Sequence, residues 1–315
     1  MKEVKTEGLY APEFLLRGEI MNRVLNDKRA IMVFVLPSFL LFALIVILPI
    51  FMSGYYSMLN WDGIGEGKFV GLQNFIDLFR NSSEGFGKSI MNSLILAVLS
   101  VFVQLPIALI LALILASGVK GEGFYRTVFF IPVIISTVVI GQLWMKVYNP
   151  SYGLLNTLLN NIGLGSLSRA WLGETKTALI AAFIPSVWQY IGYHMLLMYA
   201  AIKTIPDEIY EAARIDGASA FKTALRITIP LIRPIIKVCI IFAIIGSLKV
   251  FDLVYILTNG GPVHSSEVPS TLMYNTIFNK YMYGSGSAMA IFIVLECLVF
   301  TLIVQKLFKV EEYTF

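Results

Sequence analysis

The chain has 315 residues, of which 57% are hydrophobic and only 14% are charged, and its formal net charge is +4. Soluble domains carry about 25% charged residues, so this composition excludes an ordinary soluble protein and predicts a membrane protein. The positive charge does not indicate a nucleic-acid partner, because the basic residues lie mostly at the ends of apolar blocks. Cys239 and Cys297 both lie inside such blocks, where we expect small apolar fillers rather than disulfide or metal ligands.

Six apolar blocks follow one another along the chain. They cover residues 30–52, 89–117, 124–148, 177–201, 234–258 and 285–308. Each is near or above the ~20 residues that a membrane-spanning helix requires. Backbone groups in hydrocarbon must be satisfied within their own segment, so the blocks predict helices. We therefore expect an all-α, polytopic membrane protein with about six transmembrane helices. Residues 1–29 have mixed charge, and the first block is too long for the apolar core of a cleavable signal peptide.

The basic residues predict the orientation of these spans. If the N-terminus is cytoplasmic, the cytoplasmic segments are 1–29, 118–126, 202–237 and 306–315, and they carry 16 of the 24 Lys and Arg residues. The opposite segments carry 7, and Lys249 lies inside a block. Basic residues are enriched on the cytoplasmic side of membrane proteins. Both termini and the loop at 204–234 are therefore predicted to be cytoplasmic.

The loop at 204–234 is the most polar passage between the later apolar blocks. Two short amphipathic helices fit it, with Thr204 predicted to cap the first and Pro206 to lie in its opening turn. The pair Asp216-Gly217 is expected to break the run, because Gly tolerates the backbone angles of a tight turn. In the second helix Phe221, Leu225 and Ile229 recur at helical spacing, which predicts an apolar stripe.

This loop carries a family motif. Glu211-Ala212-Ala213, then Gly217, then Ile229-Pro230 resembles the EAA motif of ABC importer permeases, with Ile229 where the family usually has Leu. Residues 216–219 resemble its sugar-importer branch, as does the run from Phe251 to the Gly-Gly-Pro at 260–262, and residues 70–75 resemble the VGLxNF stretch after the first span. The resemblance covers about residue 30 to the C-terminus.

The resemblance implies a transmembrane domain at 30–315, preceded by a cytoplasmic segment at 1–29, in a bacterial inner or plasma membrane. It implies four kinds of partner: a second homologous permease, two ABC ATPase subunits, an extracytoplasmic solute-binding protein and membrane lipid. The loop at 204–234 would couple to the ATPases. The coupling residues implied are Glu211, Ala212, Ala213, Asp216, Gly217, Ala218 and Pro230.

No catalytic or metal site is predicted in this chain. Gly87-Lys88-Ser89 resembles the end of a P-loop, but Ser82 stands where the first Gly must be. His194 lies in a predicted span, and no His or Cys spacing suits a metal. We therefore expect no cofactor on this chain, with ATP and Mg²⁺ bound by partner ATPase subunits.

Polar and aromatic residues inside the spans are candidates for a substrate path, because such residues are costly in lipid. The candidates are Trp188, Gln189, Tyr190, Tyr193, His194, Lys249, Asp252 and Tyr255. The alternative for the aromatic residues is packing between helices. The alternative for Lys249 and Asp252 is mutual neutralisation at i, i+3. Asn92, Gln104 and Gln142 are expected to bond neighbouring helices together.

The sequence thus favours the permease subunit of an ATP-driven importer for a sugar or oligosaccharide. One alternative keeps the machinery and changes the solute to a glycerol-phosphate-type compound, although no Arg lies well inside a span. Another is an ion-coupled secondary transporter, which would need paired intramembrane acids, whereas Glu296 and Asp252 are the available ones.

Overall fold

The structure, a computed structural model, describes residues 28–80 and 85–308. The chain divides into two compact units, residues 1–55 and residues 56–315. The described residues are mostly helical, and their only strands are the two-residue β1 (Leu59–Asn60) and β2 (Lys68–Phe69). These strands pair antiparallel, with Leu59 opposite Phe69. The all-α fold is confirmed, whereas the predicted segment at 1–29 lies almost wholly outside the described residues.

The first unit is a single run of helix. It comprises α2 (Lys28–Phe42), the π-helical turn η1 (Ala43–Ile47) and α3 (Leu48–Tyr56). Residues from Met32 to Tyr56 are long and apolar enough to cross a membrane, and none of their most apolar window is buried within the chain. A helix that is apolar all round and exposed suits lipid as its solvent.

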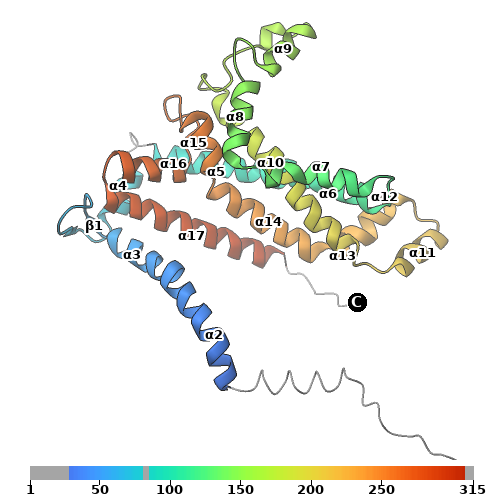
Figure 1. The fold of residues 1–315 in the computed structure, drawn as a ribbon, viewed down its shortest axis with the longest axis horizontal. Helices are drawn as coiled ribbons and strands as arrows, with labels where there is room; N and C mark the ends of the chain where they lie inside the picture. The colour runs from blue at the N-terminus through green and yellow to red at the C-terminus, as the bar shows by residue number, and fades with distance from the viewer. Residues whose placement is uncertain (1–27, 81–84, 309–315) are drawn as a thin grey trace, which may run out of the picture. The chain divides into compact units, whose positions relative to one another are not determined.

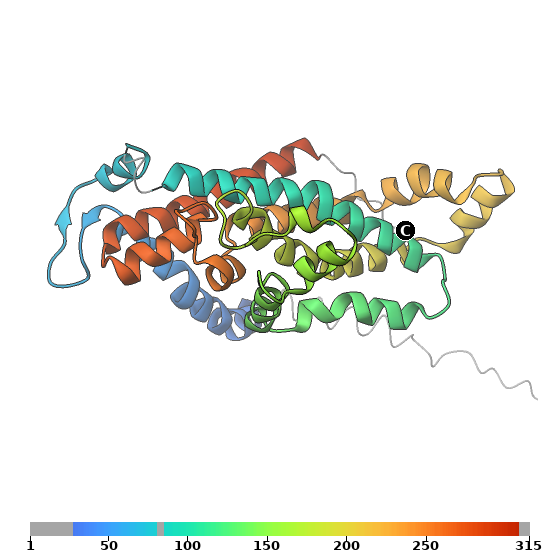
Figure 2. The same ribbon diagram turned by 90° about the horizontal axis from the view of Figure 1, so that it is seen from above.

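The second unit is a helical bundle with short helices at its ends (Figures 1 and 2). Its long elements are α5 (Phe86–Leu99), continued by η3 (Ser100–Gln104) and α6 (Leu105–Ala116), then α7 (Glu122–Ile134), α8 (Thr137–Val147), α10 (Ala178–Ile202), α14 (Arg233–Leu248) and α17 (Tyr283–Leu307). Its short elements are α4 (Gln73–Arg80), α9 (Leu154–Asn161), η4 (Gly165–Leu167), α11 (Asp207–Ile215), α12 (Ala220–Thr223), η5 (Ala224–Thr228), α13 (Ile229–Leu231), α15 (Asp252–Thr258), α16 (Pro269–Tyr274) and η6 (Asn275–Asn279).

The expected spans are roughly reproduced. Among the described residues four helices are long and apolar enough to cross a membrane, or five if the bent pair α7 and α8 counts as one span. The fourth expected block forms the 25-residue helix α10, which is not among them. Polar residues in the middle of α10, such as Gln189 and His194, lower its hydropathy, and both side chains are buried in the bundle rather than offered to lipid.

Two of the expected spans are interrupted. The block at 124–148 was predicted to be one helix, but α7 and α8 meet at 95°. Pro132 lies in the last turn of α7, and Ile135 and Ser136 adopt extended backbone angles before α8 begins. Proline removes a backbone donor and disfavours a continuous helix. The block at 234–258 has a break of three residues between Leu248 and Asp252, where α14 gives way to the shorter α15, yet Arg233–Thr258 still counts as one span of 26 residues.

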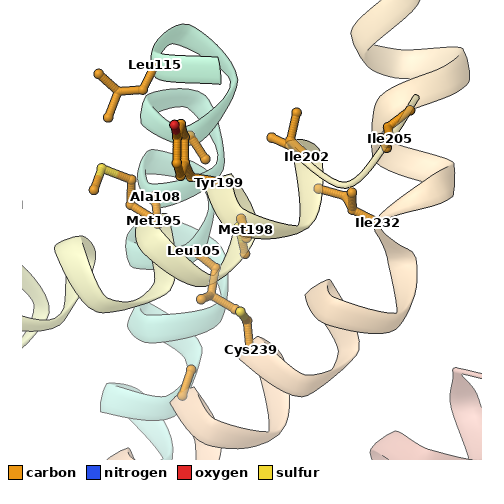
Figure 3. Close-up of a cluster of buried hydrophobic side chains, with 12 residues drawn as sticks. Leu105, Ala108, Leu115, Met195, Met198, Tyr199, Ile202, Ile205, Ile232 and Cys239 are labelled. Atoms are coloured by element: carbon orange, nitrogen blue, oxygen red, sulfur yellow. The ribbon is translucent and has the colours of Figure 1, made fainter. Parts of the chain in front are cut away.

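The largest buried cluster joins α6, α10 and α14 (Figure 3). Ala108 and Ala112 of α6 are fully buried beside Met195 and Met198 of α10. Small residues allow helices to approach closely, and unbranched methionine fills the irregular space that remains. This cluster extends to Ile205 and Ile232, so the core reaches both ends of the loop between α10 and α14.

Two asparagines bind loop backbone at other places in the bundle. The Asn74 amide, in the VGLxNF stretch, donates to the carbonyls of Ser57 and Leu59 at 2.8 Å each. The Asn92 amide donates to the carbonyl of Glu267 at 2.7 Å. Asn92 was predicted to bond to a neighbouring helix, but its partner is a loop, because the chain between α15 and α16 folds back against α5. Both amides therefore fix connections rather than spans.

Candidate functional site

Two sites stand out in the second unit: the segment between α10 and α14, residues 203–232, and a cavity among the helices. We call the segment the α10–α14 loop. It holds the two predicted short helices, α11 and α12, and the second continues through η5 and α13 towards α14. Pro206, not Thr204, occupies the N-cap position of α11, so the predicted Thr204 cap is wrong. The Thr204 hydroxyl instead donates to the Ala201 carbonyl at 2.8 Å, because α10 extends to Ile202 and Thr204 belongs to its end.

Gly217 ends α11 in a two-bond turn. Its backbone angle φ is +72°, in the left-handed region. The Gly217 N–H donates to the Arg214 carbonyl at 3.0 Å, and the Ala218 N–H donates to the Ala213 carbonyl at 2.9 Å. This pair of bonds is the Schellman arrangement, which satisfies the last carbonyls of a helix and favours glycine. The spacing of Ala213, Gly217 and Ala218 in the motif is therefore the spacing that a Schellman turn at the end of α11 requires.

The second short helix begins immediately after this turn. Ser219 is its N-cap, and the Ser219 hydroxyl accepts a bond from the Lys222 N–H at 3.4 Å. The turn and the cap leave only residues 216–219 between the two helices, so the angle between the helices is set by Gly217 and Ser219 together. Pro230 lies in the first turn of α13, where its missing N–H costs nothing.

The loop is anchored at its base and exposed at its tip. At the base, Ile205 and Ile232 are 5% and 2% exposed, and the hydroxyls of Tyr210 and Thr228 lie 3.4 Å apart. At the tip, Ile215 and Phe221 are 87% and 75% exposed. Figure 1 shows α11 and α12 at one end of the bundle. A structure that is fixed at both ends and apolar at its tip can transmit force from a bound partner to both α10 and α14.

Some of the predicted coupling residues are exposed, and one is buried at the base of the loop. Glu211, Ala212 and Asp216 are exposed, Ala218 is half-buried, and Ala213 is buried against the base of the loop. Glu211 forms no ion pair with any residue that the structure describes. An exposed, unpaired carboxylate next to an alanine leaves room for a cationic side chain of another protein.

A cavity of about 380 Å³ lies among α5, η3, α8, α10, α14 and α15. Of the predicted substrate-path residues, six line it: Gln189, Tyr190, Tyr193, His194, Lys249 and Asp252. A volume of this size falls in the range of small-molecule sites, which combine apolar walls with a few polar groups. These six come from α10 and from the break between α14 and α15, so the interruption of the fifth block places charged groups on the wall.

Three lining residues of the cavity, all on α10, have polar atoms without partners. Ser186 Oγ, Gln189 Oε1 and His194 Nδ1 are buried and make no hydrogen bond to any described residue. Buried polar atoms normally have partners, and leaving one unpaired costs about 1–3 kcal/mol. Ser186 was missed by the sequence analysis, although its spacing of three from Gln189 puts both on one helix face.

Lys249 and Asp252 do not neutralise each other. No ion pair joins them in the part of the chain that the structure describes, and both side chains are exposed while lining the cavity. The pairing alternative is therefore wrong. The reason is the break at residues 249–251, which removes the helical geometry that i, i+3 pairing requires.

Trp188 and Tyr255 lie away from the cavity wall. Trp188 makes an edge contact with Trp144, with ring centroids 5.9 Å apart, and is 40% exposed. The Tyr255 ring lies 5.1 Å from the rings of both Phe251 and Tyr274. These contacts match the packing alternative for aromatic residues. The sequence did not distinguish Trp188 from its neighbours Gln189 and Tyr190, which line the cavity.

The cavity also includes a polar contact that sequence analysis did not predict. The Ser247 hydroxyl of α14 donates to the Ser100 hydroxyl of η3 at 3.0 Å, and both residues line the cavity. Gln104, expected to bond helices together, lines it as well. Serines are common in apolar helices, and tertiary packing decides which way each serine points. No local signal in the sequence therefore shows that Ser100 and Ser247 line a cavity.

Residues 104–309 match the family described as binding-protein-dependent transport system inner membrane component. The chain belongs to this family. A probable ABC transporter permease protein of Bacillus subtilis, YurN, is 40% identical over 289 residues, which cover 91% of this chain and 98% of that protein. The matched segment contains the α10–α14 loop and most of the cavity wall. The chain is thus a multi-pass membrane component of a transport system.

Other relatives carry substrates in their names. The diacetylchitobiose uptake system permease protein NgcF of Streptomyces coelicolor is 34% identical, with 84% of this chain and 78% of that protein covered. The trehalose/maltose transport system permease protein MalF of Thermococcus litoralis is 35% identical, with 86% and 91% covered. A crystal structure of a bacterial alginate ABC transporter, in complex with an alginate pentasaccharide-bound periplasmic protein, aligns with a TM-score of 0.75 at 25% identity, covering 94% of this chain and 96% of that one.

Proposed function

We propose that this permease is the membrane-spanning subunit of an ATP-driven importer for a sugar or oligosaccharide. The family depends on a binding protein, and relatives that match most of the chain are named for uptake of diacetylchitobiose and of trehalose or maltose. The lining of the cavity supports the same substrate class, because Ser186, Gln189 and His194 contribute polar side chains to it, of a kind that bonds to hydroxyl groups. Tyr190 and Tyr193 add aromatic faces on which a sugar ring can stack.

The observation that carries the proposal is the geometry of the α10–α14 loop. Its base is buried in the main core, its tip is exposed and apolar, and Gly217 fixes the angle between its two helices. We infer that cytoplasmic ABC ATPase subunits bind the tip, and that ATP and Mg²⁺ are bound by those subunits. When the ATPases close, the loop moves α10 and α14 together, and both helices line the cavity.

The remaining partners follow from the same function. A second homologous permease would complete the translocation path, two ATPase subunits would drive it, and an extracytoplasmic solute-binding protein would deliver the sugar. The Lys and Arg distribution supports cytoplasmic termini and a cytoplasmic α10–α14 loop. Lys249 and Asp252 give the cavity wall one charge of each sign, which suits a neutral sugar better than a glycerol-phosphate-type anion.

The proposal is tested by isolating the tagged permease from its native membrane and identifying the proteins that accompany it. We expect ABC ATPase subunits and a second permease in stoichiometric amounts. The complex, reconstituted in liposomes with ATP on the ATPase side, should take up labelled oligosaccharide only when the binding protein is added on the other side. A permease that transports with no ATPase, or one driven by an ion gradient alone, would refute the proposal.

A further inference from the structure

A compact polar cluster joins the start of α7 to the end of α10. It consists of Glu122 and Arg126 of α7, Tyr199 of α10 and Lys203 at the C-cap of α10. We call these four residues the α7–α10 clamp. The sequence analysis assigned none of them a role. Lys203 is also the first residue of the α10–α14 loop, so the clamp lies directly at the root of the segment proposed to bind the ATPases.

The hydroxyl of Tyr199 donates a hydrogen bond to the carboxylate of Glu122. The ammonium group of Lys203 lies 3.7 Å from the same carboxylate and donates to the Ala116 carbonyl, at the end of α6, at 3.2 Å. The guanidinium carbon of Arg126 and the ammonium of Lys203 lie 5.5 and 5.6 Å from the Tyr199 ring centroid. Glu122 and Tyr199 thus join the start of α7 to the end of α10, and Lys203 joins both to the end of α6.

A second contact fixes α7 to α10 two turns further along both helices. A Cβ atom added at Gly192 would lie 1.9 Å from the Phe129 carbonyl oxygen, so the two backbones touch there. Gly192 precedes Tyr199 by seven residues, and Phe129 follows Glu122 by seven. The two helices are therefore joined at two points on corresponding faces, and one cannot move along the other without breaking a contact.

The far end of α7 leads to the cavity. After the 95° bend, α8 begins at Thr137, and Thr137 lines the cavity together with residues of α10 and α14. α7 makes no cavity contact of its own among the described residues. A displacement of the α10–α14 loop can therefore reach the α8 wall through the clamp and α7, in addition to its direct route along α10 and α14.

We propose that Tyr199 and Glu122 are positioning residues for transport: they transmit movement of the α10–α14 loop to α7 and so to the α8 wall of the cavity. This inference rests on the proposed function. The partial exposure of the clamp agrees with a role in transmitting movement rather than in stabilising the fold. The side chains of Lys203 and Glu122 are 43% and 26% exposed, and ion pairs this open to solvent contribute little to folding.

The test compares three variants in the complete complex, reconstituted with ATPases and binding protein. Tyr199→Phe removes one hydroxyl and leaves the buried ring, while Glu122→Gln removes the charge. Tyr125→Phe is the matched control, because Tyr125 lies one turn from Glu122 and its hydroxyl bonds to no described residue. The readout is the number of sugars imported per ATP hydrolysed, together with the amount of assembled complex.

We expect Tyr199→Phe to lower the import-to-ATP ratio roughly fivefold, the factor that one hydrogen bond contributes to an equilibrium. Glu122→Gln should lower the ratio by a similar factor, because a neutral amide accepts a weaker hydrogen bond than a carboxylate and loses the ion pair with Lys203. Assembly should stay normal in both, and Tyr125→Phe should keep a normal ratio. A ratio for both clamp variants equal to that of Tyr125→Phe would overturn the inference. If Tyr199→Phe does not assemble, Glu122→Gln gives the same two outcomes. Failure of the proposed function would differ, because wild-type complex would then show no ATP-driven uptake.

Discussion

Replacement of Gly217 by alanine isolates the role of the turn in the α10–α14 loop. The residue has φ of +72°, and a Cβ atom added there would have no heavy atom within 4 Å. The substitution therefore creates no steric clash and acts through backbone strain alone. An L-residue with a Cβ atom pays about 1–2 kcal/mol in the left-handed region. If α12 must keep its angle to α11 to bind the ATPases, this strain lowers the affinity of the permease for the ATPases.

A cost of about 1–2 kcal/mol corresponds to a factor of about 5–30. We expect Gly217→Ala to weaken ATPase binding by that factor, measured by titrating ATPase subunits onto the permease pair in nanodiscs. Gly217→Asn should bind within about twofold of wild type, because asparagine tolerates the left-handed conformation.

Gly87→Ala is the control for the effect of an added methyl group. Gly87 lies in the first turn of α5, has no heavy atom within 4 Å of a Cβ and no positive φ. It should leave ATPase affinity unchanged. If Gly217→Ala bound the ATPases as tightly as Gly217→Asn, the turn would not set the docking geometry and the reasoning would be wrong.

Three further predictions follow from the loop, the cavity and the topology. Glu211→Ala should abolish uptake and binding-protein-stimulated ATP hydrolysis while membrane levels stay normal, because the exposed carboxylate has no described partner within the chain; normal uptake and stimulation together would contradict its coupling role. Gln189→Ala should raise the sugar concentration for half-maximal transport about fivefold, the effect of one hydrogen bond. Gln142→Ala, at an exposed glutamine outside the cavity, should leave that concentration unchanged. Equal values for the two variants would remove Gln189 from the substrate path. In membrane vesicles of known sidedness, Ser219→Cys should react with an impermeant thiol reagent only from the cytoplasmic face and Gly65→Cys only from the opposite face; the reverse pattern would invert the predicted topology.

The sequence by itself determined the features that depend on neighbours along the chain. Hydropathy located the helical blocks, because a spanning helix satisfies its own backbone. The spacing of Ala213, Gly217 and Ala218 marked the loop, because a Schellman turn is formed by residues within six positions of one another. The family resemblance came from the same local motifs, and the family match over residues 104–309 confirmed it.

The tertiary structure alone decided which polar residues share a cavity. Trp188 and Gln189 are adjacent in sequence, yet one packs against Trp144 and the other lines the cavity. The 95° bend after α7 also changed one predicted span into an angled pair, and a three-residue break before Asp252 interrupted another. Hydropathy cannot reveal either result, because it measures how apolar a segment is and carries no information about which face of a helix meets another. Those faces are fixed by contacts between residues that are distant in sequence.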